Sequence, residues 1–95
     1  MKAELVYRTK RVLSDGSIIE MVIWRLPEPV PGSAHGYKYR LYFGKDGLRL
    51  VGYDNERGKG DHRHLDQGET AYRFTTPEQL VHDFLEDVRR WRQGI

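Results

Sequence analysis

The residues best suited to chemistry lie together near the middle of the chain, between Tyr53 and His64. This histidine segment, Tyr-Asp-Asn-Glu-Arg-Gly-Lys-Gly-Asp-His-Arg-His, contains two of the four histidines and is interrupted by Gly58 and Gly60. Glycines let a backbone bend and approach a ligand closely. Functional residues are often carried on loops that a rigid scaffold positions. The composition therefore predicts a loop that carries chemistry.

Cleavage of an RNA phosphodiester is the first reaction that these residues can support. It needs a base to take the proton of the 2′-hydroxyl, an acid for the leaving oxygen and a cation for the phosphate. His62 and His64 are the candidates for base and acid, because histidine changes charge near neutral pH. The candidates for holding the phosphate and for orienting a histidine are Arg63, Arg57, Lys59, Asp54 and Asp61. On RNA this mechanism requires no metal and no other cofactor.

Two other interpretations of the same residues stay open. The His-x-His spacing of His62 and His64 also occurs in zinc sites with a carboxylate as third ligand, and the nearby candidates are Asp54, Asp61 and Asp66. Alternatively, the segment is a solvated charged loop.

The backbone conformation decides which of these side chains meet. In an extended backbone the two imidazoles share one face, roughly 6–7 Å apart, with Arg63 on the other. In a turn all three side chains could converge.

Short alternating segments around the histidine segment predict β-strands. They cover residues 3–9, 18–26, 37–43, 48–53 and 71–75. Asp15-Gly16 and Asp46-Gly47 favour hairpin turns. Three prolines between residues 27 and 31 end the second strand, because proline cannot feed a sheet ladder. That strand is apolar on both faces near its centre, so it is expected in the middle of the sheet.

The C-terminal segment predicts an amphipathic helix. Thr76 suits the N-cap, Gln79 completes a Thr-x-x-Gln capping box, and Gly94 is the predicted stop. The apolar residues recur at helical spacing: Leu80, Val81, Phe84, Leu85, Val88 and Trp91. Only a sheet face offers enough apolar surface to bury this stripe. The expected fold is a single α+β domain over residues 1–95, an antiparallel sheet of about five strands with the helix across one face.

Alternation in the third strand separates a core face from a solvent face. Tyr37, Tyr39 and Phe43 are expected in the core. Lys38, Arg40 and Tyr42 then face the other way, where the basic residues can contact substrate and the tyrosine can stack on a base. Asn55 is expected to cap the loop or to contact substrate. His35 lies in the segment between the second and third strands, residues 27–36, which we call the proline segment. It is expected to be exposed, as is His82 on the helix surface.

Composition excludes several classes of site. The chain has 95 residues, no cysteine, a formal net charge of +2 and a calculated pI of about 9.0. Without cysteine there is no disulfide, thiolate metal site or catalytic thiol, and the absence fits a cytoplasmic location. The N-terminal residues do not form a signal peptide, and no apolar run is long enough to span a bilayer, so no membrane partner is expected.

In this order the elements resemble a known family. The Tyr-Asp-Asn strand end, the glycine-containing loop, Asp61-His62-Arg63-His64 and the C-terminal helix resemble the TumE-type toxins of toxin–antitoxin systems. The resemblance covers nearly the whole chain. Its most specific parts are Asp54-Asn55 and residues 61–64.

The resemblance implies a growth-inhibiting toxin of a type II toxin–antitoxin pair that acts on RNA or translation. Its implied partner is a cognate antitoxin, typically a helix-turn-helix DNA-binding protein, and RNA or the ribosome is the implied target. The rival hypothesis is a non-enzymatic module that binds protein or nucleic acid through the basic face around Lys38, Arg40 and Arg49.

Overall fold

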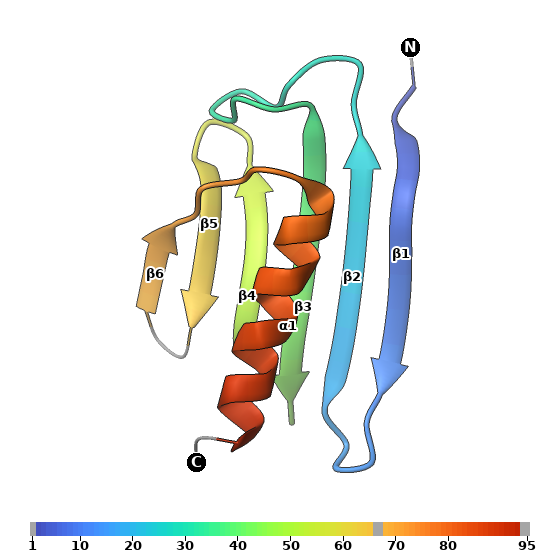
Figure 1. Ribbon diagram of the computed structural model, residues 1–95, viewed down its shortest axis with the longest axis vertical. Coiled ribbons are helices and arrows are strands. Elements are labelled where there is room, and N and C mark those ends of the chain that lie inside the picture. The colour runs from blue at the N-terminus through green and yellow to red at the C-terminus, as the bar shows by residue number, and fades with distance from the viewer. Residues whose placement is uncertain (1, 66–67, 94–95) are drawn as a thin grey trace.

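A sheet covered on one side by a single helix makes up the computed structural model, which describes residues 2–65 and 68–93 (Figure 1). Its six strands are β1 (Glu4–Val12), β2 (Ile18–Arg25), β3 (Tyr37–Lys45), β4 (Leu48–Glu56), β5 (Gly60–Leu65) and β6 (Gly68–Ala71). Every strand pairs antiparallel with its sequence neighbour, so the order across the sheet is β1 to β6. The predicted α+β class is confirmed, with β2 inside the sheet as expected.

Two elements near the histidine segment differ from the sequence-based expectation. The segment is mostly strand: β4 continues to Glu56, β5 starts at Gly60, and only residues 57–59 form the turn between them. The strand predicted at 71–75 is instead β6 at Gly68–Ala71. Tyr72 and Phe74 leave the sheet and pack against the core on the way to the helix. The apolar residues of this connection therefore gave the pattern typical of a strand, although they lie outside the sheet.

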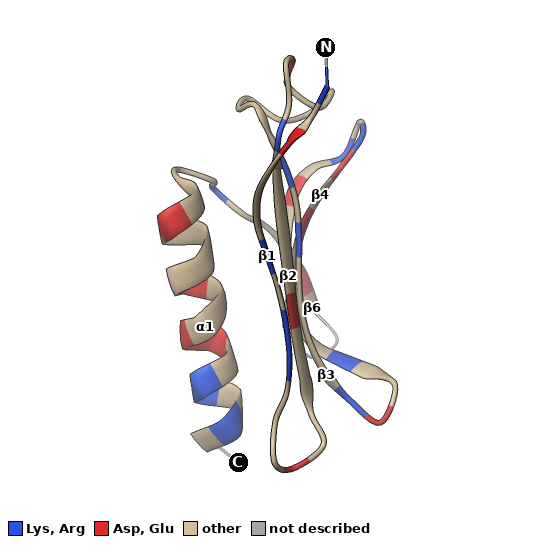
Figure 2. Cartoon of the chain, turned by 90° about the vertical axis from the view of Figure 1, so that its right-hand side faces the viewer, with Lys and Arg blue, Asp and Glu red and all other residues tan. Residues whose placement is uncertain are grey.

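Helix α1 (Pro77–Gln93) lies along one face of the sheet, and Figure 2 shows the sheet edge-on with the helix on one side of it. The Oγ1 atom of Thr76 accepts the backbone N–H of Gln79 at 3.0 Å, as an N-cap should. The side chain of Gln79 donates to Asp83 and so does not close the predicted box. The predicted stop at Gly94 lies outside the described residues. No helix within the described residues is long and apolar enough to cross a membrane.

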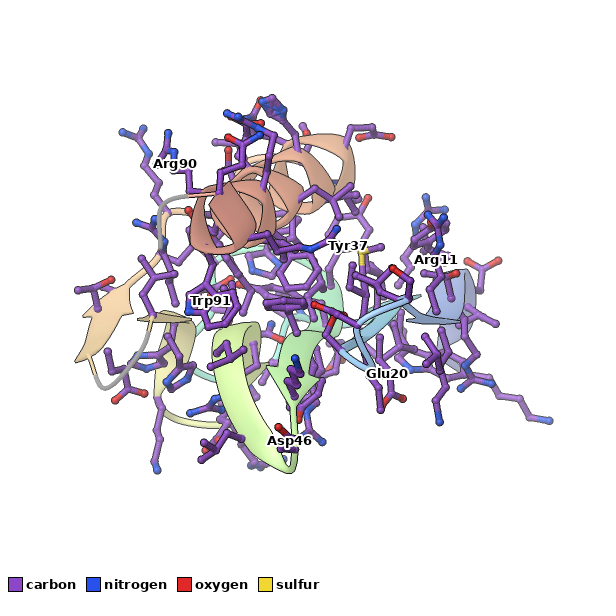
Figure 3. The ribbon with its side chains drawn as sticks, turned by 90° about the horizontal axis from the view of Figure 1, so that it is seen from below. Arg11, Glu20, Tyr37, Asp46, Arg90 and Trp91 are labelled. Atoms are coloured by element: carbon purple, nitrogen blue, oxygen red, sulfur yellow. The ribbon has the colours of Figure 1, made fainter. Side chains whose placement is uncertain are left out.

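The core lies between α1 and the inward side chains of β2, β3 and β4. Leu80, Phe84 and Val88 of the helix are buried against Tyr39 and Phe43, as the periodicity predicts. Figure 3 shows Trp91 between helix and sheet and Arg90 pointing away from it. Leu85, assigned to the apolar stripe, is 41% exposed because it lies at the margin of the buried face.

The proline segment between β2 and β3 is held against the β4–β5 turn. The Gly58 N–H donates to the Pro31 carbonyl at 2.6 Å. Gly32 has a φ of +97°, and a Cβ there would lie 2.9 Å from the Gly60 nitrogen. Only glycine fits both the left-handed backbone and this close approach. The turn that precedes the histidines is thereby fixed to the rest of the sheet.

Candidate functional site

The alternation of β5 divides the histidine segment between the two faces of the sheet. His62 and His64 are opposite Asp54 and Gly52 of β4, on the surface away from α1, which we call the open face. Asp61 and Arg63 lie on the helix side, as their contacts below show. The extended-backbone alternative therefore holds: the two histidines share a face, and Arg63 does not converge with them.

The hydrogen bonds of His62 determine which ring nitrogen carries its proton. Its Nε2 lies 2.7 Å from the carbonyl oxygen of Lys59, and a carbonyl only accepts, so Nε2 donates. In the neutral ring Nδ1 is then unprotonated. This atom is buried, has no hydrogen-bond partner among the described residues, and lies 3.7 Å from Oε2 of Glu69. A bare ring nitrogen held in place by a backbone contact is what a general base requires.

His64 is fixed in the same tautomer by a different contact. Arg49 has no acceptor atom, so the 3.1 Å contact between its Nη2 and Nδ1 of His64 makes Nδ1 the acceptor. Nε2 therefore carries the proton in the neutral ring. It points at two carboxylates, with Oδ1 of Asp54 at 3.7 Å and Oε2 of Glu69 at 3.4 Å. The donor nitrogen of His64 therefore faces carboxylate oxygens from both neighbouring strands, β4 and β6.

The two histidines approach one and the same atom. Nδ1 of His62 and Nε2 of His64 lie 3.7 and 3.4 Å from Oε2 of Glu69. One ring nitrogen is an acceptor and the other is a donor. A phosphate group in the place of this carboxylate would thus have a proton acceptor on one side and a proton donor on the other, as acid–base catalysis at a phosphate needs.

The side chain of Arg63 lies on the opposite face, where it joins the sheet to the helix. Its Nε and Nη2 donate to the two carboxylate oxygens of Asp87 at 2.9 and 2.7 Å, and the Tyr53 hydroxyl donates to the same carboxylate. Asp87 is 5% exposed. The hydrogen bond to Asp87 raises the pKa of Arg63, and burial followed by this carboxylate raises the pKa of Tyr53. The structure thus gives Arg63 an anchoring position in place of the predicted place beside the phosphate.

Asp61 also lies on the helix side and orients a different histidine from those predicted. Its carboxylate accepts from Ser33 Oγ at 2.6 Å and from the Tyr39 hydroxyl at 2.8 Å, and it lies 2.6 Å from Nε2 of His35. His35 is stacked on Phe74, with ring centroids 3.9 Å apart. Its side chain is 15% exposed, so the expectation that it is exposed is wrong. Asp61 holds the proline segment on the sheet.

Asn55 is buried, and its side chain is hydrogen-bonded to the backbone of β3. Its Oδ1 accepts the Tyr39 N–H at 2.9 Å, and its Nδ2 donates to the Tyr37 carbonyl at 2.7 Å. Both contacts join β4 to β3. Of the two roles expected for Asn55, fixing the backbone is the one that the geometry favours.

A comparison with protein-family models places the chain among known proteins. The model described as toxin TumE matches residues 2–92. The chain belongs to the TumE toxin family. A search of curated proteins and a search of solved structures each found no match. Family membership establishes the role of a toxin, and the site described above is what this TumE-family toxin offers for chemistry.

The basic residues predicted to bind substrate occupy different parts of the toxin. Arg40 and Lys38 lie on the open face, where they line a hollow that also contains Asp54. The Lys38 ammonium donates to the Asn55 carbonyl. Lys59 lines a smaller hollow with His62. Arg57 lies at the turn, beside the proline segment.

The metal interpretation gains no support from the toxin's geometry. Among residues 2–65 and 68–93, no group of three or more histidine, aspartate or glutamate side chains is arranged to hold a metal ion. Asp66, one of the ligands considered from sequence, lies outside the described residues.

Two residues of the toxin's site were not linked to the histidines from the sequence. Glu69 follows them on the next strand, and its position opposite His64 depends on a β5–β6 hairpin that was not predicted. Arg49 reaches His64 across Gly52, whose missing side chain leaves the space that the arginine occupies. A signal existed for Arg49, because it is the one charged residue of the segment 48–53 and stands three residues before the glycine of that segment.

Proposed function

We propose that this toxin inhibits growth by cleaving RNA without a metal ion, with His62 as general base and His64 as general acid. The approach of both rings to one oxygen of Glu69 carries the proposal. Glu69 has a half-exposed side chain, so it can turn aside and leave its place to a substrate phosphate. The phosphate would then have the bare nitrogen of His62 on the side of the attacking 2′-oxygen and the protonated nitrogen of His64 on the side of the leaving 5′-oxygen.

In the proposed reaction Nδ1 of His62 takes the proton of an RNA 2′-hydroxyl while that oxygen forms a bond to the adjacent phosphorus. The bond from phosphorus to the 5′-oxygen of the next nucleotide breaks, and the doubly protonated ring of His64 gives the proton of Nε2 to that oxygen. The products carry a 2′,3′-cyclic phosphate and a 5′-hydroxyl. Asp54 and Glu69, which lie beside Nε2 of His64, orient the ring that gives this proton.

Arg49 supplies the cation for the phosphate in this mechanism. It lies beside His64, and it is exposed, so its guanidinium is free to move onto a substrate phosphate. Arginine binds phosphate by two parallel hydrogen bonds. When Arg49 turns to the phosphate it releases Nδ1 of His64, which can then take up the second proton. Lys38 and Arg40 hold neighbouring phosphates on the same face.

A cognate antitoxin completes the proposal. Membership of a toxin family implies in general a partner that neutralises the toxin, and we propose a helix-turn-helix DNA-binding protein encoded by the adjacent reading frame. Sequencing that frame tests this part. A neighbour with no helix-turn-helix segment would contradict it.

Induced expression in bacteria tests the roles of the histidines. The toxin should arrest growth, and His62→Ala or His64→Ala should relieve the arrest. His82→Ala is the matched control, because His82 is exposed on the helix, away from the open face. Arrest that persists in both site variants, at equal protein level, would remove the catalytic roles.

A cleavage assay on total RNA, with and without a chelator, separates the alternatives. Products that resist the chelator and end in cyclic phosphate support acid–base histidines. Products that disappear with the chelator support a metal. RNA that stays intact although it is bound supports the non-enzymatic binding module, which the basic residues of the open face would favour.

A further inference from the structure

The open face is hollowed well beyond the histidines. A hollow of about 620 Å³ over β1, β2 and β3 shares Val22 and Arg40 with a second, of about 430 Å³, over β2, β3 and β4. The second shares Asp54 and Glu56 with a third, of about 240 Å³, which contains His62. The three therefore form one groove across the strands from β1 to His62. In Figure 2 the helix lies on the other side of the sheet.

Positive charge gathers in the part of this groove that is farthest from the histidines. The basic residues lining it on β1 to β3 are Arg8, Lys10, Lys38 and Arg40. On the same three strands, Glu20 is the one acidic residue that lines the groove. The carboxylates Asp54, Glu56 and Glu69 lie at the other end. An anionic chain would therefore be held on β1 to β3 and reach the histidines by its continuation.

Aromatic side chains accompany these cations. The guanidinium of Arg8 lies 5.6 Å from the ring centre of Trp24, and both belong to the open face of β1 and β2. Tyr42 lines the first hollow beside Arg40. Aromatic rings that alternate with cations in a groove are how proteins bind single-stranded nucleic acid, because bases stack on the rings while cations contact phosphates.

We propose that residues Arg8, Lys10, Trp24, Lys38, Arg40 and Tyr42 form a track for single-stranded RNA, with Arg8 and Trp24 as the subsite farthest from the histidines. The inference rests on the proposed function and adds to it the form of the substrate and its path. Bases of a duplex are already stacked on each other, so only an unpaired strand offers them to Trp24. The four steps between neighbouring strands from β1 to β5 span about 19 Å, which suits a short single strand.

Binding of a fluorescent 12-nucleotide single-stranded RNA, followed by anisotropy at several salt concentrations, tests the track. Every protein carries His62→Ala so that the RNA stays intact. Arg8→Ala should weaken binding about fivefold and lower the salt slope by about 0.7 for the lost phosphate contact. Trp24→Ala should weaken it about fivefold or more while leaving the slope unchanged. Arg11→Ala is the matched control, because it removes the same charge from the helix side of β1, opposite buried Ile19.

Equal affinity of Arg8→Ala and the parent protein would overturn the inference, as would an equal loss in Arg11→Ala or tighter binding of duplex than of single-stranded RNA. So would an absence of RNA binding while Arg8→Ala abolishes capture of the antitoxin, because the face would then bind protein. The proposed function fails separately. If His62→Ala and His64→Ala still arrest growth, catalysis is refuted while the binding result stands. If these variants relieve the arrest but Arg8→Ala binds RNA as tightly as the parent protein, the track alone is refuted.

Discussion

Replacing Arg63 by methionine should destabilise the toxin without touching the open face. Arg63 lies between the two histidines in the sequence, yet its guanidinium binds Asp87 of the helix. Methionine keeps most of the length of the apolar stem and removes the charge and both hydrogen bonds. The carboxylate of Asp87 then stays buried with the Tyr53 hydroxyl and with Arg90, whose Nη1 is 3.9 Å away.

The size of the effect follows from the burial of the two partners. Breaking a buried ion pair from one side costs about 3–5 kcal/mol. The Arg63 side chain is 31% exposed, whereas that of Asp87 is 4% exposed, so some water already reaches the pair. We therefore expect a loss of about 2–3 kcal/mol in the free energy of unfolding, near the value of hydrogen bonds to charged groups.

Urea unfolding of the purified protein measures this loss, in a His62→Ala background that permits its production. With a slope of about 1 kcal/mol per molar urea, the midpoint should fall by about 2–3 M. Asp87→Asn should restore much of the stability lost in Arg63→Met, because asparagine carries no buried charge and still accepts from Tyr53. The double variant should therefore be about 1–2 kcal/mol more stable than the two single losses added together.

A different pattern would refute this account of Arg63. If Arg63→Met unfolds within about 0.5 kcal/mol of the parent and the same change abolishes growth arrest, then Arg63 acts on the substrate. The anchoring role would also fail if the losses from Arg63→Met and Asp87→Asn simply add.

Three further predictions concern the site, the tyrosines and the proline segment. Gly52→Ala places a methyl group 2.8 Å from Cδ of Arg49, so the arginine must move away from His64. RNA cleavage should then fall about tenfold or more. If Arg49→Ala lowers cleavage further in the Gly52→Ala variant, the two residues do not act through the same contact. Burial first, then the carboxylates of Asp61, Asp87 and Asp83, raise the pKa of Tyr39, Tyr53 and Tyr72, so the unfolded chain loses these protons near pH 10 before the fold does. Stability should be complete below about pH 10 and fall above it by up to about 1.4 kcal/mol per pH unit for each tyrosine; unfolding curves that coincide at pH 9 and pH 11 would contradict it. Asp61→Ala leaves the hydroxyls of Ser33 and Tyr39 without their acceptor and should cost about 2–4 kcal/mol in urea unfolding, whereas a loss below 1 kcal/mol would show that this contact does not anchor the segment.

Local sequence patterns were sufficient for the framework of this fold. Asp-Gly turns, alternating strands and the capped helix each follow from neighbouring residues, and each is present in the structure. Periodicity also placed Tyr39, Phe43, Leu80 and Phe84 in the core. Most of β4 was predicted at residues 48–53, whereas its end and β5 were assigned to a loop because these segments carry polar residues on both faces. Alternation indicates a strand only where one face is apolar.

The composition of the site depended on strand register, which sequence spacing alone does not determine. His62 and His64 share a face in any extended segment, so their association was predictable. Arg49 and Glu69 meet His64 from β4 and β6, and a shift of one residue in either pairing would turn them to the helix side. Asp61 and Arg63 were grouped with the histidines because they are adjacent in sequence. Alternation in β5 sends them to the opposite face, where they stabilise the fold.

The strictly sequential order of the strands has a consequence for how the toxin is made. Each strand pairs with the one before it, so a chain leaving the ribosome can build the sheet from β1 onward. The proposed site includes Glu69 of β6, and the helix that anchors Arg63 follows that strand. We therefore expect the nascent toxin to stay harmless until the segment through α1 has been synthesised, which gives an antitoxin time to meet it at the ribosome.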